Sequence, residues 1–109
     1  MSRVQEALRR FDEERGWNRV RVEHTFLHLY EELGEVAREL LRQVGYKEGS
    51  ARLTDELADA GLLLYKLAEQ LGVDLEEAML SKLNENASRF PVASSRAALE
   101  RYLATNDED

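Results

Sequence analysis

The chain has 109 residues, of which 43% are hydrophobic and 34% charged, and 22 acidic against 15 basic side chains give a formal net charge of -7. This charge argues against binding to a nucleic acid polymer or an anionic membrane, and the absence of cysteine excludes disulfides and thiolate zinc sites. No apolar stretch is long enough to span a bilayer, so we expect a cytoplasmic protein whose residues 1–109 form a single helical domain.

Hydrophobic periodicity predicts two helices in the first half of the chain. Ser2, followed three residues later by Gln5, is a capping-box pattern that starts the first helix, and Gly16 ends it. A connector over residues 17–22 precedes a second helix with an apolar stripe, which ends at Gly45.

The second half of the chain is predicted to add two further main helices and a short last one. After a loop over residues 46–50, the third helix covers residues 52–71. The fourth begins after a cap at Asp74 and ends at Pro91. Ser94 or Ser95 is predicted to cap the short last helix.

These elements predict an all-α fold, a helical bundle of four main helices plus a short C-terminal helix. The core of the domain is expected in residues 2–91, with the short helix and an acidic tail in residues 92–109. A core of this modest size would benefit from self-association, so an oligomer is expected.

Two pairs of acids, Glu32/Glu35 and Glu56/Asp59, occupy matching positions on the second and third predicted helices. In both pairs the acids lie about 100° and about 160° around the helix from the central apolar residue. Acids on an amphipathic helix usually lie on its solvated face, and each pair alone fits that explanation. The helix directly after Asp59 is apolar nearly all round, however, which favours a site where the two helices face each other.

Four clustered carboxylates would require cations. Two like charges about 4 Å apart repel by roughly 4 kcal/mol at an effective dielectric constant of about 20. Hard oxygen ligands select Mg²⁺, with Mn²⁺ as a possible substitute, and Mg²⁺ commonly shares its coordination between carboxylates and substrate phosphates. An acidic protein of this kind is suited to binding a nucleotide as its metal complex.

Other candidate binding residues are less specific. Lys82, Asn86 and Arg89 recur at i, i+4 and i+7 on the fourth helix, where they either hold phosphate oxygens or simply keep the surface soluble. Trp17 in the connector either stacks on a base or packs in the core or an interface.

The chain resembles the MazG-like all-α nucleotide pyrophosphohydrolases, with dCTP pyrophosphatases among the nearer relatives. The resemblance rests on three stretches: Arg15-Gly16-Trp17, EELGEVARELL at 31–41 and DELADAGLLLYKLAEQLGVDLEEAMLSKLNENASRFP at 55–91. Some dCTP-type relatives have aromatic residues in places where this chain has Leu41, Arg42 and Leu63, so the resemblance leaves the preferred base open.

The resemblance implies a role for each candidate residue. It implies that magnesium is held by Glu32, Glu35, Glu56 and Asp59. It further implies that phosphates or neighbouring groups are contacted by Lys82, Asn86 and Arg89, and that Trp17 lies near the base. Members of this family form dimers or tetramers with sites built between subunits, so a homodimer or homotetramer is expected.

The resulting hypothesis is a magnesium-dependent hydrolase that converts nucleoside triphosphates to monophosphates and pyrophosphate, and so removes unwanted nucleotides. Glu35 and Glu56 are the expected catalytic carboxylates, with Glu35 positioning or deprotonating the attacking water. Two alternatives stay open, a phosphoribosyl-ATP pyrophosphohydrolase and a non-catalytic helical oligomerisation module.

Overall fold

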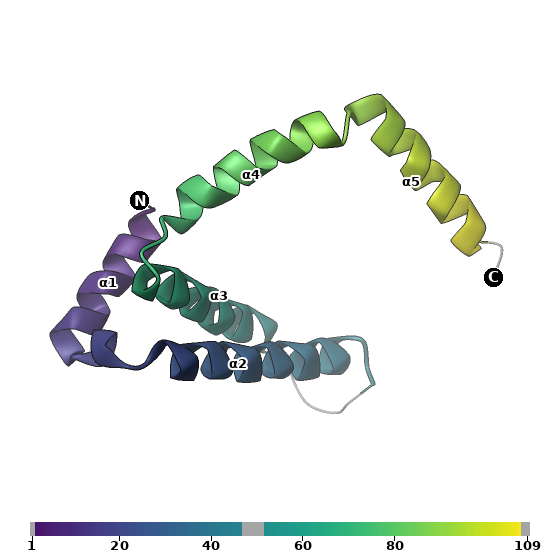
Figure 1. Cartoon of the computed structure of the whole chain (residues 1–109). Helices are drawn as coiled ribbons and strands as arrows, with labels where there is room; N and C mark the ends of the chain where they lie inside the picture. Colours follow the sequence, from purple (N-terminus) through teal and green to yellow (C-terminus); the bar gives the residue numbers. More distant parts are fainter. Residues whose placement is uncertain (1, 47–51, 108–109) are drawn as a thin grey trace. The chain divides into compact units, whose positions relative to one another are not determined.

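Every regular element in the computed structural model, which describes residues 2–46 and 52–107, is a helix (Figure 1). The elements are α1 (Arg3–Arg15), the 3-10 turn η1 (Trp17–Arg19), α2 (Val22–Gln43), α3 (Leu53–Gln70), α4 (Leu75–Arg89) and α5 (Val92–Asp107). The all-α prediction is therefore confirmed. Residues 47–50 of the predicted loop and residues 108–109 of the acidic tail lie outside the described residues, whereas Asn106 and Asp107 belong to α5.

The chain divides into two compact units between Glu76 and Glu77. The first unit contains α1, α2 and α3, and the second contains most of α4 together with α5. That residues 1–109 act as one domain stays a prediction. In the described part of the chain, no helix combines the length and the apolar character needed to cross a bilayer.

Both predicted ends of α1 are confirmed. The Ser2 hydroxyl oxygen accepts a hydrogen bond from the Gln5 N–H at 3.0 Å, which satisfies one of the free donors of the first turn. Gly16 ends the helix with φ 74°, a left-handed conformation that glycine adopts without steric cost. The predicted connector then contains the short turn η1.

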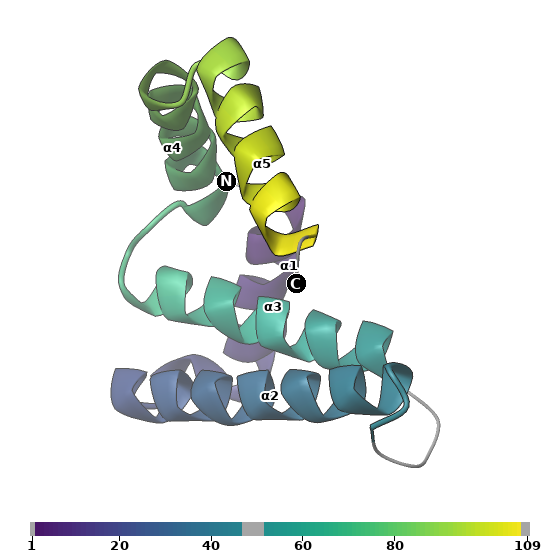
Figure 2. The same ribbon diagram turned by 90° about the vertical axis from the view of Figure 1, so that its right-hand side faces the viewer.

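Helices α2 and α3 lie side by side in both views and run in opposite directions (Figures 1 and 2). The buried apolar residues are few and mostly small, namely Leu29 on α2 with Ala60 and Ala68 on α3. Many larger apolar side chains stay exposed, including Leu27 and Tyr30 on α2. The two helices thus pack closely along one narrow seam, and the candidate site lies on that seam.

A fully buried glutamine joins α1 to the turn between α3 and α4. The Gln5 amide group donates to the Glu69 carboxylate at 2.9 Å and to the Val73 carbonyl oxygen at 2.8 Å. Its own oxygen accepts a hydrogen bond from the Leu75 N–H at 3.1 Å. These three bonds hold α1 against the end of α3 and the turn that follows it.

A buried glutamate performs a similar task at the other end of α3. Glu39 on α2 accepts a hydrogen bond from the backbone N–H of Arg52 at 2.8 Å, directly before α3 begins, and forms an ion pair with Arg42. Its side chain thereby ties the end of α2 to the start of α3.

The predicted start of the last helix is wrong. α5 begins at Val92 and has 16 residues, so Ser94 and Ser95 lie inside its first turn instead of capping it. The fixed φ of Pro91 and its missing N–H suit the start of a helix, and the Ser95 N–H already donates to the Pro91 carbonyl at 3.0 Å.

Candidate active site

The α2–α3 seam brings three of the four predicted acids together. Oxygen atoms of Glu32 on α2 and of Glu56 and Asp59 on α3 all lie within 4.8 Å of one another. Glu32 and Glu56 are half-buried, while Asp59 is exposed. The acids occupy matching positions on α2 and α3, and three of them form a carboxylate cluster between these two antiparallel helices.

Glu56 is the acid most affected by this arrangement. Its partial burial raises its pKa above the ordinary value, and a hydrogen bond with Glu32 acts in the same direction. The negative charges of Glu32, Asp59 and Glu35 raise the pKa further. The carboxylates thus repel one another, and a cation bound here would relieve the repulsion.

Glu35 lies on the same side of α2, close enough for its charge to act on Glu56. Its carboxylate oxygen is 3.3 Å from the Arg38 guanidinium on the same helix. Glu35 is therefore near the three clustered acids and already has a cationic partner. Its roles as metal ligand and catalytic residue stay predictions.

A cavity of about 510 Å³ adjoins the carboxylate cluster. It begins one turn after Asp59 on α3 and one turn before Glu32 on α2, where Leu63 and His28 contribute to its wall. Most of the wall is apolar or aromatic, formed by Leu8, Phe11, Trp17, Val20, Leu62 and Leu63. A cavity with such a wall suits a ligand that is partly apolar.

Trp17 is part of this wall, a position that is compatible with the predicted stacking on a base. Its ring meets the Phe11 ring edge to face, with 5.8 Å between the ring centres, and half of the residue stays exposed. The indole is thus held by Phe11 and still offers surface to a ligand. That it contacts a base stays a prediction.

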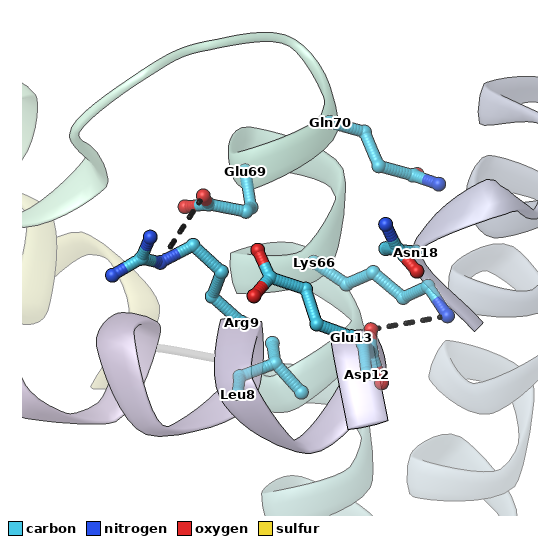
Figure 3. A pocket seen from close by; sticks show the side chains of 8 residues that line it. All are labelled: Leu8, Arg9, Asp12, Glu13, Asn18, Lys66, Glu69 and Gln70. Carbon is cyan, nitrogen blue, oxygen red and sulfur yellow. Dashed lines mark ion pairs between the residues drawn. The ribbon is translucent and has the colours of Figure 1, made fainter. Parts of the chain in front are cut away.

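A smaller, polar cavity of about 230 Å³ is also lined by Asp12 and Lys66, which it shares with the apolar cavity (Figure 3). In it, Arg9 faces Glu69 and Lys66 pairs with Asp12. This ion pair was not predicted from the sequence. The signal available was Lys66 itself, the one charged residue in the run Leu62–Ala68.

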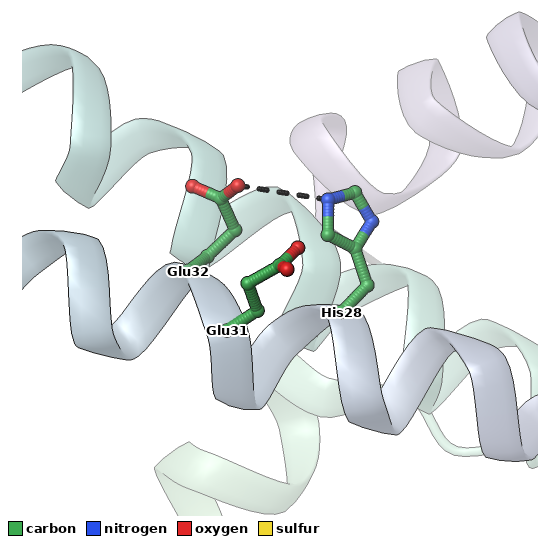
Figure 4. A group of neighbouring side chains, drawn as sticks. All are labelled: His28, Glu31 and Glu32. Atoms are coloured by element: carbon green, nitrogen blue, oxygen red, sulfur yellow. Dashed lines mark ion pairs between the residues drawn. The ribbon is translucent and has the colours of Figure 1, made fainter.

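A second potential metal-binding group lies next to the first on α2 (Figure 4). His28, Glu31 and Glu32 offer ligand atoms within 4.8 Å of one another, and the His28 ring nitrogen Nε2 is 3.6 Å from the Glu32 carboxylate. Glu32 therefore belongs to both groups. The i, i+4 spacing of His28 and Glu32 was the sequence signal for this contact.

Lys82, Asn86 and Arg89 lie on α4 within the second unit. The Lys82 ammonium is 3.4 Å from the Glu85 carboxylate, and the Arg89 guanidinium lies over the Phe90 ring, 5.1 Å from its centre. Their contact with substrate phosphates stays a prediction.

Comparison with known proteins identifies the family. The MazG-like family model matches residues 22–102. Similar proteins are dCTP pyrophosphatase 1 of Rattus norvegicus and of Mus musculus, each 33% identical over 102 residues, covering 84% of this chain and 59% of the relative. The same enzyme of Bos taurus is also 33% identical, with 60% of its length covered. The chain belongs to the MazG-like family.

The chain spans about 59% of the length of the rodent relatives that it matches. No solved structure matches it significantly.

Proposed function

We propose that the protein is a nucleotide pyrophosphohydrolase that converts nucleoside triphosphates to monophosphates and pyrophosphate, and so cleanses the nucleotide pool. The observation that carries the proposal is the convergence of Glu32, Glu56 and Asp59 beside a cavity with an aromatic wall. Membership of the MazG-like family supports it, and so do the names of the similar dCTP pyrophosphatases.

The donor set fits a hard divalent cation. The carboxylate oxygens lie within 4.8 Å of one another, and the pKa of Glu56 is raised. A bound Mg²⁺ would neutralise the negative charges that otherwise repel one another. Glu32, Glu56 and Asp59 would hold the ion, with Glu35 as a fourth ligand, and Mn²⁺ would substitute. When bound, the ion neutralises charge on the carboxylates and on the substrate phosphates.

In the proposed reaction, the oxygen of a water molecule bonds to a phosphorus of the triphosphate, and the phosphoric anhydride bond to the departing pyrophosphate breaks. Glu35 orients the water and accepts its proton, and Glu56, the other expected catalytic carboxylate, would act as a ligand of the metal. The base lies in the apolar cavity against Trp17, and the phosphates point to the carboxylates. Lys82, Asn86 and Arg89 contact phosphates or neighbouring groups.

We also propose that the chain forms a homodimer or homotetramer. Between Glu77 and Asn106, no described residue is buried, and large apolar side chains such as Leu83 and Val92 are 65% and 74% exposed. A second copy of the chain would remove these surfaces from water.

The experiment incubates the protein with single deoxynucleoside and ribonucleoside triphosphates, canonical and modified, with and without Mg²⁺, and quantifies pyrophosphate and orthophosphate separately. Pyrophosphate release that requires the metal supports the proposal, and no release from any nucleotide contradicts it. Including phosphoribosyl-ATP tests the first alternative. For a non-catalytic helical module, Mg²⁺ would produce no saturable rise in Tm.

A further inference from the structure

One buried ion pair lines the apolar cavity. The Lys66 ammonium on α3 is 3.3 Å from the Asp12 carboxylate on α1, and their side chains are only 14% and 8% exposed. Figure 3 shows the pair reaching across between the two helices. Both residues line the apolar cavity as well as the polar one.

Stability alone is a weak explanation for such a pair. Removing two charges from water costs about as much as their attraction returns, so apolar side chains of similar volume are often equally stable or better in such a place. On the side of the apolar cavity, Leu8 and Leu62 line the same wall as the pair. A charged pair in this position therefore points to recognition of a polar group.

The pair keeps hydrogen-bonding capacity for a ligand. A lysine ammonium has three N–H donors, and among the described residues Lys66 has Asp12 as its one ion-pair partner. A carboxylate accepts several hydrogen bonds through its two oxygens. Behind the pair, in the polar cavity, the side-chain oxygen of Gln70 is buried without a hydrogen-bond partner in the described part of the chain.

The position of Lys66 on α3 relates it directly to the carboxylate cluster. Lys66 follows Asp59 by two helical turns, which places it about 10 Å along the helix axis and only about 20° around it. Leu63 lies between them and forms part of the cavity wall. This span is comparable with that from the α-phosphate of a nucleotide to the hydrogen-bonding edge of its base.

We propose that Asp12 and Lys66 read the hydrogen-bonding edge of the base. Asp12 accepts from an amino group or ring N–H, and Lys66 donates to a neighbouring carbonyl oxygen or ring nitrogen. The inference rests on the proposed function. It assigns base selection to this pair because Asp12 and Lys66 form the one ion pair within the described lining of this cavity, whose other polar residues are His24, Thr25 and His28. Bases that differ in one donor or acceptor at this edge, such as cytosine and uracil, are told apart here.

The test exchanges the two charges. In the double variant Asp12→Lys/Lys66→Asp the ion pair is kept, but donor and acceptor change places. We expect the ratio of kcat/KM for dCTP to that for dUTP, measured with Mg²⁺, to shift by at least about tenfold relative to the original chain, the effect of one charged hydrogen bond. A pair that only holds α1 to α3 would leave this ratio unchanged.

A second variant covers the case in which the exchanged pair does not fold. Asp12→Leu/Lys66→Met replaces the pair by apolar groups of similar volume, and circular dichroism and Tm check that the fold is kept. The ratio between its highest and its lowest kcat/KM among dCTP, dUTP, dGTP and dATP should decrease by about tenfold. The matched control is the exchange Arg21→Glu/Glu23→Arg in an exposed ion pair of 2.9 Å, which should keep the base ratios.

The outcomes separate the two proposals. Unchanged base ratios in a folded, active double variant overturn the role of Asp12 and Lys66 and leave the hydrolase intact. No pyrophosphate from any nucleotide with the original chain overturns the proposed function itself.

Discussion

The carboxylates of Glu32 on α2 and Glu56 on α3 lie within 4.8 Å of each other, with that of Asp59 beside them. Such proximity of like charges costs free energy, and partial burial together with these charges raises the pKa of Glu56. A metal-binding cluster needs this arrangement, because the ligands must be in place before the ion arrives. The folded protein should therefore be less stable without metal than its packing alone would allow.

The variant Glu56→Gln separates stability from function. Without metal at neutral pH, Tm should rise, because the amide removes one negative charge from the cluster and keeps the shape of the side chain. The rise in Tm on adding Mg²⁺ should largely disappear, and kcat/KM should fall at least about 100-fold, since even changes to residues behind the metal ligands commonly cost 10- to 100-fold. Differential scanning fluorimetry and a pyrophosphate assay measure these effects.

The control for this variant is Asp55→Asn, which changes the neighbouring acid. Asp55 is exposed, pairs with Arg52 at 3.2 Å and is not part of the cluster. It should keep both the response to Mg²⁺ and most of the turnover. Equal turnover in the Glu56→Gln variant and the original chain would refute Glu56 as a metal ligand.

The pH dependence of metal binding follows from the same pKa. Because Glu56 has a higher pKa in the folded protein than in the unfolded chain, the folded protein binds more protons between the two values. Without metal, stability therefore decreases as the pH rises through this window. Mg²⁺ binds the deprotonated carboxylate, so the rise in Tm that it causes should increase over the same window.

Measurements of Tm with and without Mg²⁺, from mildly acidic to neutral pH, check this expectation. Calorimetry in buffers of different ionisation enthalpy should also detect protons released on Mg²⁺ binding. A metal-induced change in Tm that is constant with pH would contradict the assignment. In the Glu56→Gln variant this pH dependence should be absent.

The sequence was informative where local periodicity decides the structure. Ser2 and Gly16 bound α1 as predicted, because caps act within a few residues. Glu32, Glu56 and Asp59 meet because the position of an acid relative to an apolar stripe determines where it lies between two packed helices. The start of α5 was missed because Ser94 and Pro91 both suit a helix start, and the proline lies earlier.

Contacts between residues far apart in the chain could not be read from the sequence. Gln5 fits the capping pattern of α1, yet its side chain binds Glu69 and the turn after α3. Asp12 fits a solvated helix face, yet it is buried against Lys66. Such pairings depend on how α1 packs on α3, which local patterns do not specify.

The buried amide of Gln5 offers a test of this packing. Replacing it by alanine removes three hydrogen bonds and leaves the Glu69 carboxylate and the Leu75 N–H short of a partner. We expect a loss of about 2–3 kcal/mol in the free energy of unfolding. Urea denaturation followed by circular dichroism measures it, with Gln43→Ala at an exposed position as the matched control. Equal losses in both variants would show that the Gln5 bonds contribute little.

Glu39 should stabilise the α2–α3 hairpin through its contact with the first residues of α3. Glu39→Ala leaves the Arg52 N–H without its acceptor and Arg42 without its charged partner, and should cost about 1–2 kcal/mol. Glu39→Gln keeps an oxygen for the N–H and should lose less. Since the same hairpin aligns Glu32 with Glu56, the alanine variant should also weaken Mg²⁺ binding; an unaltered Mg²⁺ affinity would separate the two effects.

Trp17 is the one tryptophan of the chain, so its fluorescence reports on the apolar cavity without labelling. A base that stacks on the half-exposed indole should quench and shift the emission when a non-hydrolysable nucleoside triphosphate is added with Mg²⁺. Trp17→Phe keeps an aromatic surface beside Phe11 and should raise KM less than Trp17→Ala, for which we expect an increase of about tenfold or more. Inorganic triphosphate with Mg²⁺ lacks the base and should leave the emission nearly unchanged. Equal quenching by both ligands would contradict a base that stacks on Trp17 in this cavity.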